Sequence, residues 1–117
     1  MPQLIESPSR IPVPGGKVID EYVGRANSST PEVSVAHMRA PAGWEEPAQT
    51  PDFDEVTLVL TGLVRVEHDG GSLDVSAGQA VLTRAGERVR YSVGDKGAEY
   101  VAVCLPAFAP EMAHRDE

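Results

Sequence analysis

Glycine and proline recur along the whole chain at intervals too short for long helices to form between them. The 117 residues include eleven Gly and ten Pro, and the segments between these residues are rich in valine. β-Branched side chains favour extended backbone, whereas Gly and Pro favour turns and end regular structure. The pattern predicts short strands joined by tight turns. We therefore expect an all-β domain.

The chain divides into three regions of different composition. Residues 1–31 hold five prolines and a Gly-Gly pair, which predicts an irregular N-terminal arm with one or two edge strands. Residues 32–106 alternate apolar and polar side chains between turns, which predicts a closed barrel or sandwich. Residues 107–117 form a charged tail. The length fits one domain.

The alternation also predicts where individual strands begin and end. Residues 44–54 hold two prolines and four acidic side chains, so we expect mostly loop there. Gly62 is expected to break one strand before the next begins. The predicted strands are 17–23, 33–40, 55–61, 63–67, 72–76, 79–84, 88–93 and 99–105.

The chain is acidic, with a formal net charge of -8 and a pI of about 4.8. This charge repels phosphate backbones and anionic lipids, so the sequence predicts neither a nucleic-acid partner nor a membrane partner. No apolar run approaches the length of a transmembrane helix. The start of the chain does not resemble a secretory signal, and the single Cys104 has no internal disulfide partner. We therefore expect a cytoplasmic location.

Two glycine-punctuated segments carry a resemblance to a known family. Glu55, six further residues and Gly62 form the first segment, and Gly78 with the following strand and the turn at Gly86 forms the second. Together they resemble the two motifs of the cupin superfamily, which implies a single-domain jelly-roll β-barrel. Residues 53–62 look most similar to the small cupins related to the ethanolamine-utilisation cupin.

The family's metal ligands are largely missing from this sequence. The positions of the two first-motif histidines fall near Gln49 and Pro51, and the second-motif histidine position is Val89. Only Glu55 remains, and one carboxylate does not hold a first-row metal tightly. We therefore expect no cofactor. The alternative is an atypical divalent-metal site, which would be built from His37, Glu46, Gln49 and Glu55.

The resemblance implies that Glu55 points into the barrel, and period-two alternation then directs Thr57, Val59 and Thr61 the same way. A carboxyl among apolar side chains has a raised pKa and exchanges protons near neutrality. Tyr91 would donate a hydrogen bond to an oxygen that becomes negative during a reaction. The expected catalytic residues are therefore Glu55 and Tyr91. The expected substrate-binding residues are Trp44, Glu46, Gln49, Phe53, Thr57 and Val89.

Structural interpretations of the same residues stay open. Glu55 can instead be a buried carboxylate that Arg84, Arg90 or backbone amides neutralise. Tyr91 can be a core aromatic residue with its hydroxyl at the edge. His37 can lie on the outer face of its strand, where it would not reach the interior.

These observations favour a small-molecule enzyme that uses metal-independent acid–base chemistry, of the isomerase, cyclase, dehydratase or decarboxylase (lyase) type. We favour an enzyme because a buried carboxylate costs free energy unless a function or a partner uses it. The alternatives are a non-catalytic metabolite-binding or accessory cupin and an atypical metal-dependent cupin. The expected partner is a small-molecule ligand, and the resemblance implies a homodimer.

Overall fold

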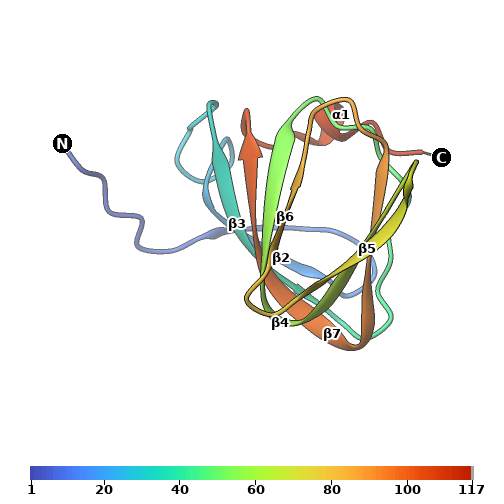
Figure 1. The fold of residues 1–117 in the computed structure, drawn as a ribbon. Helices are drawn as coiled ribbons and strands as arrows, with labels where there is room; N and C mark the ends of the chain where they lie inside the picture. The colour runs from blue at the N-terminus through green and yellow to red at the C-terminus, as the bar shows by residue number, and fades with distance from the viewer. Residues whose placement is uncertain (117) are drawn as a thin grey trace.

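The computed structural model describes residues 1–116 and contains seven strands and one short helix. Strands dominate the molecule, as the spacing of Gly and Pro predicts (Figure 1). The prediction of an all-β domain is confirmed. The elements are β1 (Ser9–Ile11), β2 (Val18–Val23), β3 (Ser34–Ala40), β4 (Asp54–His68), β5 (Gly71–Ser76), β6 (Ala80–Thr83), β7 (Val89–Leu105) and α1 (Pro110–Ala113).

The strands form one antiparallel sheet in the order β1-β2-β3-β7-β4-β5, with β6 also paired to β4. The long strands β4 and β7 pair twice. The first half of β4 pairs with the second half of β7, and the second half of β4 pairs with the first half of β7. Both strands therefore run along two walls, which closes the sheet into a barrel (Figure 1).

The corner in β4 lies at Gly62, where the sequence predicted a break between two strands. The strand continues through this point, and the register shifts between Val59 and Thr61 and again between Gly62 and Val64. The Gly62 φ of 79° is left-handed, and a Cβ there would lie 2.1 Å from the carbonyl oxygen of Gly97. The shift also reverses the alternation, so Thr61 is exposed rather than directed inward. The prediction for Thr61 is wrong because a bulge interrupts the two-residue period.

Two further segments that the sequence predicts as separate strands also form one continuous strand. The turn expected at residues 94–97 lies within β7, so the segments 88–93 and 99–105 are the two halves of one bent strand. The core is a single cluster of buried side chains. Its members are mostly valines and alanines from β4 and β7, packed against two buried tyrosines. The buried cluster comprises Ala40, Val59, Val64, Val66, Val75, Val89, Tyr91, Val93, Ala98 and Tyr100.

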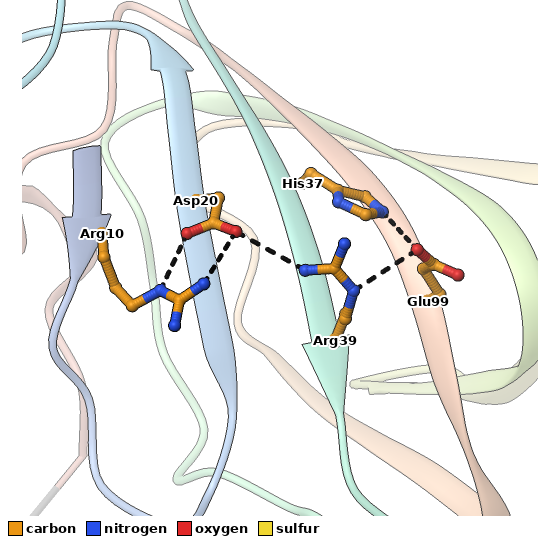
Figure 2. A network of polar contacts seen from close by, with 5 residues as sticks. All are labelled: Arg10, Asp20, His37, Arg39 and Glu99. Atoms are coloured by element: carbon orange, nitrogen blue, oxygen red, sulfur yellow. Dashed lines mark hydrogen bonds and ion pairs between the residues drawn. The ribbon is translucent and has the colours of Figure 1, made fainter. Parts of the chain in front are cut away.

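The N-terminal segment attaches to the barrel through charged side chains on the outer face. Arg10 of β1 donates two hydrogen bonds to the buried Asp20, with N–O distances of 3.0 and 3.2 Å. Arg39 bridges Asp20 to Glu99, and Glu99 also lies 2.6 Å from His37 (Figure 2). This chain of contacts crosses β1, β2, β3 and β7 and holds β1 on the sheet.

Candidate functional site

A cavity of about 230 Å³ lies on the inner face of the sheet, against side chains of β2, β3, β4 and β7. Residues 11–14 of the arm and Arg115 of the C-terminal tail also line this cavity, which we call the barrel lobe. A second cavity of about 170 Å³, here called the tryptophan lobe, is lined by Trp44 and Pro47. The two lobes share lining residues, which include Val13, Lys17, Glu46 and Arg115.

Glu55 enters the barrel lobe from the start of β4. Burial raises the pKa of this carboxyl to about 7, and the negative charge of Glu46 adds to the rise. Within residues 1–116 the Glu55 carboxylate forms no ion pair. Arg84 pairs with Asp54, and Arg90 pairs with Glu45. The two arginines that the sequence offered as neutralising partners are therefore engaged elsewhere. Glu55 can exist in either protonation state near neutral pH.

Lys17 lines both lobes and is held between two aromatic rings. Its Nζ atom lies 4.1 Å from the ring centroid of Trp44 and 5.3 Å from that of Tyr100. Contacts of this kind stabilise an ammonium through the negative face of each ring. Burial lowers the pKa of the Lys17 ammonium, while the negative charges of Glu46 and Glu55 act in the opposite direction. Among the residues that the structure describes, no carboxylate forms an ion pair with Lys17.

Glu46 and Arg115 meet where the two lobes join. The Arg115 NH2 atom lies 3.8 Å from a carboxylate oxygen of Glu46. Burial raises the pKa of Glu46, and the charges of Lys17 and Arg115 oppose that rise. Backbone contacts hold the tail in this position. The Asp116 N–H donates a hydrogen bond to the Ala48 carbonyl oxygen, and Arg115 forms an isolated antiparallel β-bridge with Gln49. Both ends of the chain therefore contribute a cation to one cavity.

The structure brings part of the predicted site together. Glu55, Glu46, Gln49 and Phe53 line the barrel lobe, and Trp44 lines the tryptophan lobe. Thr57, Val89 and Tyr91 are buried but do not line either lobe. The Tyr91 hydroxyl instead shares a hydrogen bond of 3.1 Å with Thr83, and burial raises the pKa of this phenol. Tyr91 thus occupies the position of a core aromatic residue.

His37 lies apart from the other residues of the atypical metal site. Its neighbours Ala36 and Met38 line the barrel lobe, whereas His37 contacts Glu99 in the outer network (Figure 2). The structure therefore does not bring His37 together with Glu46, Gln49 and Glu55. A search of residues 1–116 finds no group of three His, Cys, Asp or Glu side chains placed to hold a metal ion.

Sequence reasoning missed Lys17 and Arg115. Lys17 lies in the predicted arm and Arg115 in the predicted charged tail, and the site predicted from the sequence included no residue of either region. One signal for Lys17 was present, since this acidic chain has only two lysines and this one directly precedes a predicted strand. For Arg115 we find no such signal, because only the folded tail brings it beside Glu46.

The outer face of the sheet carries two cross-strand rows that contain apolar side chains, of which Leu58 and Leu82 are exposed. Cross-strand pairing aligns Val35, Val103, Val56 and Leu82 in one row across β3, β7, β4 and β6. The next row places Val101 of β7 opposite Leu58, which is 42% exposed. We call these six side chains the apolar outer face. Aliphatic residues on a strand usually face a core, so their alignment toward solvent is unusual.

No protein-family model matches the chain. A search of curated proteins finds Endoribonuclease YbeY of Myxococcus xanthus, which is 50% identical over 107 residues. The match covers 91% of this chain but only 36% of the relative. An endoribonuclease acts on RNA, so this relative contradicts the predictions of a small-molecule enzyme and of a chain without a nucleic-acid partner. The formal net charge averages the whole surface and does not report local pairs of cations.

Solved structures agree on the architecture. A Streptomyces nucleoside dehydratase, also solved with uridine, has a TM-score of 0.77 and 14% identity, covering 100% of this chain and 91% of that chain. A putative ethanolamine utilization protein from Salmonella typhimurium has a TM-score of 0.62 and 19% identity, covering 79% and 71%. At these identities the likeness shows the fold alone. The prediction of a cupin jelly-roll barrel is confirmed. In residues 1–116, no helix has the length and apolar character required to span a bilayer.

Proposed function

We propose that this chain is the RNA-binding barrel module of an endoribonuclease system. The observation that carries the proposal is the 50% identity to an endoribonuclease, sustained over 91% of this chain. Identity at this level favours a shared role beyond a shared barrel. The chain then contributes to RNA processing rather than to metabolite turnover.

The extent of the match favours a module rather than a complete nuclease. This chain spans 36% of the relative, so the match leaves most of the relative's chain uncovered. We assign RNA cleavage to that larger part and RNA binding to the barrel.

The apolar outer face is the surface that we assign to the nuclease. In the relative, the matched segment is covalently joined to a much larger remainder of the chain. A nuclease needs basic side chains to bind phosphates, and the formal charge of -8 on this chain complements such a partner. Apolar rows at the centre and charged groups at the edge are the usual anatomy of a specific interface.

A chimera tests the proposal directly. The 107 matched residues of the Myxococcus protein are replaced by this full chain, and cleavage of a labelled RNA is followed on gels. We expect the chimera to cleave RNA at a rate similar to that of the native protein, and this chain alone to leave the RNA intact. An inactive but folded chimera would contradict the proposal, and RNA cleavage by this chain alone would contradict the division of labour.

A matched pair of variants tests the assigned surface in the same chimera. Leu58→Asp places a charge on the apolar outer face, whereas Leu73→Asp places one on β5, outside that face. Both leucines are 42% exposed in the wild-type chain, so the two substitutions carry a similar folding cost. We expect Leu58→Asp to reduce cleavage and Leu73→Asp to leave it unchanged. Equal effects would remove the apolar outer face as the contact surface.

A further inference from the structure

Two cations converge on one cavity of an otherwise acidic chain. Lys17 and Arg115 line both lobes, and they stand where the barrel lobe and the tryptophan lobe join. Burial raises the pKa of Glu55 to about 7, so this carboxyl carries only part of a negative charge near neutral pH, and among residues 1–116 Lys17 forms no ion pair. The junction is therefore a local site for an anionic group in a molecule whose net charge is -8.

The donors at this junction are available to a ligand. Lys17 rests against Trp44 and Tyr100 rather than in an ion pair, so its ammonium hydrogens retain hydrogen-bonding capacity. Arg115 lies 3.8 Å from Glu46, a separation longer than a hydrogen bond. An ammonium and a guanidinium together suit a phosphate group.

The barrel lobe beyond the junction suits a flat heterocycle. Met38, Phe53 and Phe108 supply apolar walls, and Glu55 and Gln49 supply polar atoms. A carboxylate accepts from the amino and imino groups of a base, and an amide both donates and accepts. The tryptophan lobe is lined by Trp44, and the Lys17 ammonium lies over one face of that ring. Stacking on an aromatic ring is the usual way that proteins hold an unpaired base.

We propose that the two-lobed cavity binds an unpaired end of single-stranded RNA, with one base in the barrel lobe, its phosphate between Lys17 and Arg115, and the neighbouring base against Trp44. This inference rests on the proposed function and deepens it, because it places the substrate on named residues. A base in the barrel lobe has its pairing edge engaged by protein, so duplex RNA does not enter.

Trp44 is the only tryptophan of the chain, so its fluorescence reports on the site. The probe is a single-stranded RNA of about six nucleotides, within the range of known single-strand sites. We expect it to quench Trp44 fluorescence and to bind more weakly as salt rises, whereas the same sequence as a duplex has little effect. Lys17→Met is expected to weaken binding about tenfold and to reduce the salt dependence, because one phosphate contact is lost.

The matched control is Lys96→Met, which removes the only other lysine, an exposed one. Binding should be unchanged in this variant, and Lys17→Arg should restore most of the affinity lost in Lys17→Met. Circular dichroism verifies that each variant is folded. The inference is overturned if the wild-type chain does not bind the oligomer, if Lys17→Met binds as tightly as Lys96→Met, or if duplex RNA binds equally well.

The two proposals fail in different ways. If the chimera cleaves RNA while the chain shows no Lys17-dependent RNA binding, the cavity assignment is wrong and the proposed function stands. If the chain binds RNA through Lys17 but the chimera is folded and inactive, the association with an endoribonuclease is wrong.

Discussion

Lys17 Nζ lies 4.1 Å from the centroid of the Trp44 ring, which connects the N-terminal arm to the loop before β4. The contact holds a charged group at the cavity without a carboxylate partner. An aromatic ring offsets part of the cost of removing an ammonium from water. Unlike a carboxylate, it offers no oxygen atom to accept the ammonium's hydrogen bonds. Lys17 thus keeps its hydrogens for a ligand.

The first prediction concerns the protonation of this lysine. Burial should hold the pKa of Lys17 below the ordinary lysine value of 10.5, although the nearby glutamates oppose the shift. Reductive ¹³C-methylation followed by NMR titration measures this pKa, and the Lys17→Met variant identifies the Lys17 signal. We expect Lys17 to titrate below an ordinary lysine. Titration at the ordinary value would show that the rings and carboxylates compensate fully for burial.

The second prediction concerns the pH dependence of stability. Burial raises the folded-state pKa of Glu55 to about 7 from an ordinary 4.5. Between these values the unfolded chain releases a proton that the folded chain retains, so the free energy of unfolding falls as pH rises. The loss attributable to Glu55 is at most about 3 kcal/mol and is complete above pH of about 7.

Glu55→Gln removes this titration while it preserves the shape of the side chain. Urea unfolding of the wild-type chain and the variant between pH 4 and 8 isolates the effect, because all other groups are common to both. We expect the variant to gain stability relative to the wild-type chain as pH rises through this interval. A constant difference between the two proteins would mean that Glu55 titrates normally.

The third prediction concerns the corner of β4. Gly62→Ala places a Cβ 2.1 Å from the Gly97 carbonyl oxygen, a contact that requires the two backbones to separate. We expect a loss of about 3 kcal/mol or more in the free energy of unfolding. Gly78→Ala is the control, because Gly78 has a similar positive φ but no atom within 4 Å of its added Cβ. That substitution should cost only about 1 kcal/mol, and equal losses would refute a close-contact role for Gly62.

The fourth prediction concerns the attachment of the arm. Hydrogen bonds from Arg10 hold the pKa of Asp20 below its ordinary value, and the charges of Arg10 and Arg39 add to this (Figure 2). A lowered pKa means that Asp20 stabilises the fold at neutral pH and loses this contribution as pH falls through that pKa. Asp20→Asn should accelerate amide hydrogen exchange in β1.

Asp74→Asn provides the comparison for Asp20→Asn. Asp74 makes a similar two-point contact with Arg65, but both side chains are largely exposed and far from the arm in sequence. Exposed pairs contribute little to stability. Exchange in β1 should therefore be unchanged in Asp74→Asn. If both variants left β1 protected, another contact would have to hold the arm.

Local patterns in the sequence predict most of the barrel. Ala36 and Met38 lie two positions apart in the predicted strand 33–40, and the structure directs both toward the cavity, as the two-residue period of a strand requires. The patterns failed where the chain bends without ending. Gly62 carries the same signal whether a strand stops or turns a corner, and only the approach of Gly97 distinguishes the two outcomes.

The candidate site was harder to predict, because long-range packing assembles it. Glu55, Gln49 and Trp44 lie within one segment of the sequence, and the structure brings them to the two lobes. Lys17 and Arg115 join them from opposite ends of the chain, and no spacing rule relates residues so far apart. Packing also decides which atom the Tyr91 hydroxyl contacts. It forms a hydrogen bond with Thr83 instead of pointing into the cavity.

The arrangement of the cavity wall has a thermodynamic consequence. Residues 11–17 and the stretch around Arg115 reach the same space from distant parts of the sequence. A molecule bound there would contact both, so its binding free energy would oppose local opening of both segments together. A bound ligand should therefore slow proteolysis near both ends of the chain to a similar extent. The strands around the corner at Gly62 should have the same resistance to proteases with and without the ligand.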